Sequence, residues 1–293
     1  FIIKSKIMSG YHTPFTPGWD CHGLPIELQV EKKYGKGKFK DNPNAFVAAC
    51  REFARKQIEK QKADFIRLGV FADWDNPYTS MDKEVESGIV KSLSKIIDNN
   101  HVYFGSKPVH WCIESSSALA EAEVEYKDIV SKAVCVKFRI TSSSELTFTK
   151  NIDQKAHISI PIWTTTPWTL PANRAVAISK DIDYSLVQVD KDYLVIAKKL
   201  VGSVMEKAGI SEFKVVEESI KSEMSTVMLE HPFYDIKVPV IFAEHVTDEN
   251  GTGAVHIAPG HGTEDYLAGL EHDLEVYNPV DDYGRFKEGL PIF

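Results

Sequence analysis

The texture of the chain changes once, near Lys107-Pro108, and this change constrains the fold more than any other feature. Before it, apolar residues recur at helical spacing and predict amphipathic helices from Asn42-Pro43 to Gly69 and from Ser80 to Asn99-Asn100. After it come short β-rich runs between Ser, Asp, Gly and Pro turns, at residues 134–140, 158–165, 184–189, 193–196 and 238–242. A few helices interrupt these runs, near residues 201–208 and 263–270. We therefore expect a mainly helical first part, followed by an α+β part with a closed or barrel-like sheet.

Length and charge narrow the function classes. A chain of 293 residues is expected to form two domains. Its net charge of −8 argues against binding nucleic acid through general basicity. The positive region lies at the start, around the lysines of residues 32–40, and is interpreted as a solvated loop or, alternatively, as a phosphate contact. No apolar run approaches a membrane span, and the four cysteines form no Cys-x-x-Cys pair, so a reducing cytoplasm is expected.

The first motif is PGWDCHGLPIE, residues 17–27. It places a carboxylate, a thiol and an imidazole between glycines and prolines, which force turns and let polar side chains converge on a loop. From the residues alone, Asp20 is a candidate for binding an amino group, and Cys21 and His22 are candidate metal ligands. A purely structural role for all three stays open.

The second motif is WTTTPWTLPAN, residues 163–173, at the end of an apolar run. The consecutive Thr164, Thr165 and Thr166 put hydroxyls on both faces of an extended chain, and Pro167 prevents the strand from continuing in a ladder. Free hydroxyls at a strand end are therefore predicted. The alternative is that the threonines are present only because threonine favours strands.

The third motif is GTGAVHIAPGHGTEDY, residues 251–266. Its glycines lack the spacing of a dinucleotide fingerprint. They permit close backbone approach around His256 and His261, while Thr263 is predicted to be the N-cap of a helix. A zinc site made of His256, His261 and Asp265 is one hypothesis, although the spacing matches no metal signature. A polar substrate pocket is the other and is favoured.

Together the three motifs resemble those of bacterial isoleucyl-tRNA synthetases, in the same order and over essentially the whole chain. Valine and leucine enzymes carry Thr-Thr-Arg-Pro where this chain has Thr164 to Pro167, and leucine enzymes carry Ala-Phe in place of Cys21-His22. The resemblance implies a partial class I Rossmann-type catalytic domain over residues 1–115, of α/β class. A β-rich, barrel-like editing domain over residues 116–293 would follow.

By the same resemblance, the full enzyme attaches isoleucine to its tRNA and the editing domain hydrolyses valine wrongly attached to that tRNA. A pocket that accepts isoleucine excludes valine poorly, because one methylene contributes little binding energy; the isoleucine enzymes are the standard example of this limit. The balance between editing of valyl-tRNA and of valyl-adenylate stays open.

The resemblance also implies roles for individual residues. Asp265 binds the α-ammonium of the misattached amino acid, and Thr164, Thr165 and Thr166 bind the terminal ribose and the attacking water. His256 acts as a size filter. The remaining expected substrate-site residues are Trp168, Asn173, which also supports the loop, and Asp20, which would contact the ammonium of isoleucine in the synthetic site. Neither a metal nor a covalent nucleophile is implied.

Departures from the family pattern limit what is expected of this chain. The HIGH and KMSKS signatures are absent, so ATP-dependent activation is not expected here, although the full enzyme uses ATP and Mg. Cys112 is followed by Ser115 where some members have a second cysteine, so no metal is expected there. The end near residue 293 is expected to trim the editing domain.

The expected partners are the isoleucine tRNA and its valyl ester, isoleucine and valine, with no membrane and a monomeric, cytoplasmic enzyme. Two alternatives remain: an inactive tRNA-binding module, supported by the basic residues 32–40, and a zinc-dependent hydrolase.

Overall fold

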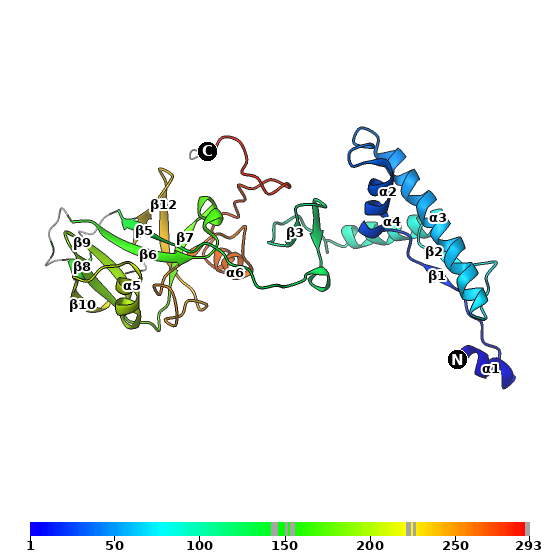
Figure 1. The fold of residues 1–293 in the computed structure, drawn as a ribbon, viewed down its shortest axis with the longest axis horizontal. Helices are drawn as coiled ribbons and strands as arrows, with labels where there is room; N and C mark the ends of the chain where they lie inside the picture. The colour runs from blue at the N-terminus through cyan, green and yellow to red at the C-terminus, as the bar shows by residue number, and fades with distance from the viewer. Residues whose placement is uncertain (142–145, 150–151, 153–155, 221–223, 225–226, 291–293) are drawn as a thin grey trace. The chain divides into compact units, whose positions relative to one another are not determined.

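The computed structural model describes residues 1–141, 146–149, 152, 156–220, 224 and 227–290. The chain divides into two compact units, Phe1–Phe104 and Gly105–Phe293 (Figure 1). The division lies where the helical texture ends, whereas the sequence analysis placed its domain boundary after residue 115. That predicted boundary falls inside a hairpin formed by residues 110–119, and the hairpin is tied to the second unit because the indole Nε1–H of Trp111 donates to the carbonyl oxygen of Asp282 at 2.8 Å.

The first unit contains α1 (Ile2–Met8), β1 (Gly18–Trp19), α2 (Leu24–Tyr34), α3 (Pro43–Arg67), β2 (Tyr78–Thr79) and α4 (Lys83–Asp98). Strands β1 and β2 are parallel and are joined through α2 and α3, which lie side by side (Figure 1). A parallel pair joined through helices is the connection of α/β folds. Helix α3 begins as predicted, with the Asn42 side chain accepting a hydrogen bond from the backbone N–H of Ala45 at 3.0 Å.

The core of the first unit is small. Its buried cluster consists of Cys21, Ala54, Ile58 and Met81. Helix α4 has no buried residue, and four apolar side chains of its predicted amphipathic face, those of Ile89, Leu93, Ile96 and Ile97, are exposed, while Val85 is half-buried. The motif PGWDCHGLPIE contributes β1 and the start of α2 to this unit.

The second unit is built mainly from strands. Its strands are β3 (His110–Cys112), β4 (Ser117–Leu119), β5 (Val134–Ile140), β6 (Ile158–Thr164), β7 (Ala175–Ile178), β8 (Tyr184–Val189), β9 (Asp192–Ala197), β10 (Lys214–Ile220), β11 (Met228–Glu230), β12 (Lys237–Phe242) and β13 (Val255–Ile257). Its helices are η1 (Glu121–Glu123), η2 (Thr147–Thr149), η3 (Pro167–Ala172), η4 (Lys198–Leu200), α5 (Val201–Lys207) and α6 (Thr263–Glu271).

Nine of these strands form one sheet in the order β10-β8-β9-β6-β5-β11-β12-β7-β13. Most neighbours are antiparallel, but β6 pairs with β9 and β12 pairs with β7 in parallel. The terminal strand β13 also contacts β6, so this part of the sheet curls back on itself. The predicted mixed class, with a barrel-like sheet in the second part, is confirmed.

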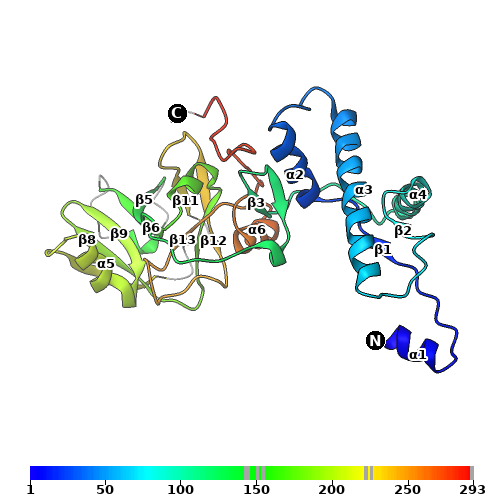
Figure 2. The same ribbon diagram turned by 45° about the vertical axis from the view of Figure 1, so that its right-hand side comes forward.

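The sheet surrounds the main core of the molecule. Ile160, Ile162, Val176, Leu186 and Ile196 are all almost fully buried on successive strands. Helix α6 packs against β13 (Figure 2). The predicted strand runs at residues 134–140 and 184–189 match β5 and β8, and the predicted helices match α5 and α6 to within a residue.

The predicted N-cap of α6 is wrong. The cap is Gly262 rather than Thr263, and the first helical hydrogen bond runs from the backbone N–H of Tyr266 to the carbonyl oxygen of Gly262 at 2.9 Å. Thr263 is already helical and exposed. Among the described residues, no helix is both long enough and apolar enough to span a membrane.

Candidate functional site

The second and third motifs meet at one end of the curled sheet. Thr164 is the last residue of β6, which lies against β13, and His256 is the middle residue of β13, where it pairs with Val176 of β7. Helix η3 connects β6 to β7, and the backbone N–H of Arg174 donates to the carbonyl oxygen of Ile257 at 2.8 Å. The sheet therefore brings together two motifs that are about 90 residues apart in sequence.

The three threonines are not equivalent. Thr164 is buried, and its Oγ1 accepts a hydrogen bond from the backbone N–H of Thr166 at 3.1 Å. The hydroxyls of Thr164 and Thr166 also lie 3.2 Å apart, within hydrogen-bonding distance of each other. Thr165 is exposed, and among the described residues its hydroxyl has no partner. The prediction of free hydroxyls at the strand end therefore holds fully for Thr165 alone.

Thr169, a residue that the sequence analysis did not single out, connects the two motifs. Its Oγ1 lies 3.0 Å from Nε2 of His256 and donates a hydrogen bond to the carbonyl oxygen of Thr166 at 2.9 Å. A hydroxyl has one proton, so a Thr169 that donates to Thr166 must accept from His256. The proton of the His256 imidazole is thereby assigned to Nε2, and Nδ1 is left as an acceptor.

His256 is held neutral by its surroundings. Its side chain is 6% exposed, and burial lowers its pKa to about 4, with smaller contributions from His261 and His231. Nδ1 is also buried and makes no hydrogen bond within the described part of the chain. The site thus has an uncharged wall at this position, with one acceptor nitrogen unused.

Trp168 and His261 form a second contact between the motifs. Their rings meet edge to face with centroids 5.2 Å apart. Trp168 is half exposed on η3, while burial lowers the pKa of His261. The indole is therefore the more exposed ring of this pair.

Asp265 is bound through one oxygen only. Its Oδ2 accepts a hydrogen bond from the backbone N–H of Ala258 at 2.8 Å, which closes the loop of the third motif onto α6. Burial raises the pKa of this carboxyl, and the Ala258 N–H opposes the shift. Oδ1 has no partner among the described residues. The arrangement suits a half-buried carboxylate that binds a cation.

Asn173 lies beneath the loop. It is fully buried, its Nδ2 donates to the carbonyl oxygen of Ala175 at 2.8 Å, and its backbone N–H donates to the carbonyl oxygen of Leu170 at 3.0 Å. These bonds support the turn from η3 into β7. The predicted contact between Asn173 and a substrate stays a prediction.

His231 is the other functional candidate that the sequence analysis missed. It lies outside all three motifs, yet its Nε2 is 3.1 Å from the carbonyl oxygen of Leu170 in η3. Thr169 was within reach of sequence reasoning, since it is a fourth threonine of the second motif. His231 was not, because only the folded sheet brings residue 231 to residue 170.

Asp20 belongs to the other unit and is described separately. Its exposed carboxylate accepts a hydrogen bond from the hydroxyl of Ser80 at 3.1 Å, and the same hydroxyl accepts from the backbone N–H of Cys21 at 2.7 Å. Nε2 of His22 lies 3.6 Å from a carboxylate oxygen of Glu86. The carboxylate of Asp20 is therefore accessible at this loop end, whereas the Cys21 side chain is buried in the small core of the unit, and a contact between Asp20 and an amino group stays a prediction.

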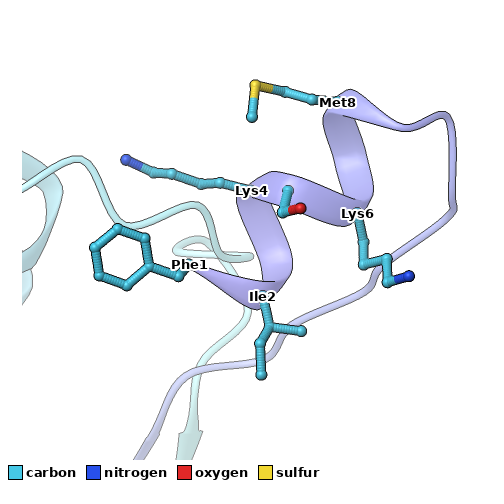
Figure 3. A pocket seen from close by; sticks show the side chains of 6 residues that line it. Phe1, Ile2, Lys4, Lys6 and Met8 are labelled. Carbon is cyan, nitrogen blue, oxygen red and sulfur yellow. The ribbon is translucent and has the colours of Figure 1, made fainter.

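Two other places in the molecule are not assigned as sites. Among the described residues, no three His, Cys, Asp or Glu side chains are arranged to hold a metal ion. His256 and Asp265 instead direct Nε2 and Oδ2 to Thr169 and Ala258. A hollow beside α1 is lined by Phe1, Ile2, Lys4, Ser5, Lys6 and Met8 (Figure 3). It is formed by a single short helix and contains no motif residue, so we assign it no function.

Known proteins similar to this chain come from the enzyme family that its motifs resemble. The sequence profile of the tRNA synthetases class I (I, L, M and V) matches residues 1–244. An isoleucine–tRNA ligase of Shewanella piezotolerans is 52% identical over 100% of this chain and 32% of its own length. That of Colwellia psychrerythraea is 49% identical over 99% of this chain and 31% of its own length. The chain thus spans about a third of these relatives.

Among solved structures, the crystal structure of GlLeuRS-CP1 is similar with a TM-score of 0.42 and 15% identity, covering 48% of this chain and 60% of that one. A likeness at this level supports no argument about the site.

Proposed function

The chain belongs to the class I tRNA synthetases, the family of the isoleucine, leucine, methionine and valine enzymes, and we propose that it is part of an isoleucine–tRNA ligase. We propose further that Gly105–Phe293 hydrolyses the valyl ester of the isoleucine tRNA. The observation that supports this most directly is the hydrogen bond between Thr169 and His256, which joins the threonine motif to the motif that contains Asp265.

Asp265 supplies the amino-acid anchor in this proposal. An aminoacyl ester carries a free α-ammonium, and Oδ1 of Asp265, which no described residue contacts by a hydrogen bond, can accept a charge-assisted hydrogen bond from it. The ammonium would offset the desolvation of the carboxylate, since an opposite charge nearby favours the ionised form. Such an anchor orients the ester carbonyl, and orientation contributes to hydrolysis without a covalent step.

The threonine loop supplies the polar contacts to the ribose and the water. The exposed hydroxyl of Thr165, which has no partner in the described part of the chain, is the direct donor and acceptor. Thr164 and Thr166 are engaged with each other and hold the loop in shape. This assignment gives separate roles to the three threonines, all of which were expected to bind the ribose and the water.

His256 supplies the size filter. A neutral imidazole next to an aliphatic side chain costs less desolvation than a charged one, and burial keeps this imidazole neutral at ordinary pH. Because its ring is fixed through Nε2 by Thr169, it cannot easily swing away to admit the extra methylene of isoleucine. Trp168 would border the same pocket from η3.

The proposal is tested by incubating the 293-residue chain with valyl-tRNA and isoleucyl-tRNA that carry the isoleucine anticodon and following the release of each amino acid. We expect release of valine and little release of isoleucine. The variant His256→Gln keeps a hydrogen-bond donor near the position of Nε2 but lacks the flat ring that limits the pocket. Its release of isoleucine should therefore rise relative to its release of valine. Binding of tRNA without release of either amino acid would favour the tRNA-binding alternative. Activity that chelators abolish, with stoichiometric zinc, would favour the metal hydrolase.

A further inference from the structure

The geometry points to His231 as a positioning residue of the deacylation site, one that holds helix η3 in place through the carbonyl oxygen of Leu170. This inference rests on the proposed function. We propose that the two nitrogens of its imidazole do separate work: Nε2 fixes the threonine-bearing loop, and Nδ1 fixes the turn that contains His231 itself.

The hydrogen-bond partners determine the form of the imidazole. A backbone carbonyl can only accept, so Nε2 of His231 carries the proton that reaches Leu170 at 3.1 Å. Backbone N–H groups can only donate, and those of Phe233 and Tyr234 lie 3.1 and 3.2 Å from Nδ1. Nδ1 is therefore unprotonated. Both nitrogens are used, and the ring is neutral.

The ring is also fixed by packing. It is 5% exposed and stacks on Tyr234 with ring centroids 4.7 Å apart and an interplanar angle of 12°. It also meets the ring of Phe138 in β5 in an edge-to-face arrangement, with centroids 6.2 Å apart. A ring held in this way by strand and turn can serve as a rigid support for whatever its Nε2 binds.

What Nε2 binds is the middle of the threonine motif. Leu170 follows Thr169, whose hydroxyl bonds both His256 and the carbonyl oxygen of Thr166. Helix η3 is thus held at two successive residues by two buried neutral imidazoles, one from β13 and one from the turn after β11. A shift of Leu170 would move Thr169 and, through it, the loop that carries Thr165.

Two amide substitutions separate the two nitrogens. In His231→Asn, the side-chain oxygen takes the place of Nδ1 and can accept from Phe233 and Tyr234, as asparagine does in ordinary turns, but nothing reaches Leu170. In His231→Gln, the longer side chain can place its NH₂ near the position of Nε2 and donate to Leu170, while the turn loses its acceptor. Both variants lose the ring stacking equally.

The experiment measures kcat and KM for release of valine from valyl-tRNA, together with thermal melting, for the unmodified 293-residue chain and both variants. We expect His231→Asn to lower kcat about tenfold with KM nearly unchanged, because misplacement of the loop affects the reacting geometry more than binding. His231→Gln should recover most of kcat although it melts at a lower temperature than His231→Asn. Full kcat in His231→Asn, or loss of kcat that merely follows the melting temperature in both variants, would overturn the inference.

A measurement that needs no activity keeps the inference separate from the proposed function. In a long-range ¹H–¹⁵N spectrum of the unmodified chain, His231 should carry its proton on Nε2, and hydrogen exchange of the Asn173 amide should accelerate in His231→Asn but not in His231→Gln. A proton on Nδ1, or equal exchange in both variants, would overturn the role of His231. An unmodified chain that releases no valine, with these signatures present, would overturn the proposed function alone.

Discussion

His231 and His256 are kept neutral for the same physical reason, although they were found by different routes. Burial is the largest cause of the lowered pKa of each imidazole, which falls to about 4 in both. Each imidazole already carries a proton on Nε2, so a second proton would have to go to Nδ1. In His231, Nδ1 accepts from the backbone N–H groups of Phe233 and Tyr234, and in His256, Nδ1 is buried with no acceptor near it among the described residues. The neutral form is therefore part of the folded site.

This makes stability dependent on pH in a defined direction. The unfolded chain takes up protons on these imidazoles near their ordinary pKa of 6.5, whereas the folded chain does so only near 4. The stabilisation is therefore complete above about pH 6.5 and is lost as pH falls towards 4, by roughly 3 kcal/mol for each imidazole. Urea unfolding of the second unit at pH 7.5, 6 and 5 checks this. A free energy of unfolding that stays constant over that range would contradict it, and His231→Gln should flatten the slope.

At the residue scale, the sequence named candidate side chains but did not predict the hydrogen bonds that each of them makes, and the membership of these residues in a substrate site stays a prediction. The position before Pro167 predicted free hydroxyls for Thr164, Thr165 and Thr166, but the structure separates them into a hydrogen-bonded pair and a hydroxyl without a partner among the described residues. The hydrogen bond from the backbone N–H of Ala258 to Asp265 could not be predicted from the sequence. It depends on where α6 begins, and the helix is capped by Gly262 rather than by the predicted Thr263.

At the scale of elements, the turn before β13 is the tightest point of the site's scaffold. Gly253 has a φ of +79°, and a Cβ added there would lie 2.3 Å from Cβ of Ala197 in β9. Its carbonyl oxygen accepts a hydrogen bond from the buried hydroxyl of Tyr184 at 2.6 Å. These contacts fix the start of β13 and therefore the position of His256 within it.

Gly253→Ala should therefore destabilise the second unit by about 3 kcal/mol or more, since strain from the positive φ adds to overpacking against β9. Gly202 is the matched control: it lies exposed on α5 with nothing within 4 Å of an added Cβ. Gly202→Ala should stabilise the helix by about 0.5–1 kcal/mol. Denaturant unfolding of both variants checks the pair, and equal effects would show that the packing around Gly253 is looser than described.

Individual elements were largely predictable, while their pairing was not. Alternation and turn residues located β5, β8 and β12, and an Asn-Pro cap located α3. The parallel pairs β6–β9 and β12–β7 leave no local signature, because each joins segments separated by several other strands. The meeting of the two motifs depends on that order, so it could be expected only from the family resemblance.

At the scale of the whole molecule, the two units differ in how much core they bury. The second unit contains a large buried apolar cluster, whereas the buried apolar cluster of the first unit, which includes Ala54 and Ile58, is small. The segment that joins them contains Tyr103 and Phe104, with exposed fractions of 89% and 106%. The change of texture at Lys107-Pro108 marked this junction in the sequence.

Brief treatment with chymotrypsin should consequently cut first at Tyr103 or Phe104 and leave a resistant piece that begins at Phe104 or Gly105. The first unit should be degraded further, because a small core gives it less protection. Mass spectrometry of the early products identifies the cuts. A first cut within residues 156–220, in the middle of the large sheet, would contradict the division into units.

The most direct test of the proposed site compares valine release from valyl-tRNA by the unmodified chain, Asp265→Asn and Glu264→Gln. The asparagine keeps an acceptor for the N–H of Ala258 and removes only the charge, so release should fall about tenfold to a hundredfold, the loss of one charge-assisted bond and its orientation. Burial raises the pKa of Asp265, so keeping this carboxyl ionised above that pKa destabilises the folded chain. The asparagine variant should therefore melt no lower than the unmodified chain at pH 7.5. Glu264 is exposed on the neighbouring helical position, and its variant should keep full activity. Full release by Asp265→Asn, or an equal loss in Glu264→Gln, would contradict the assignment of the site.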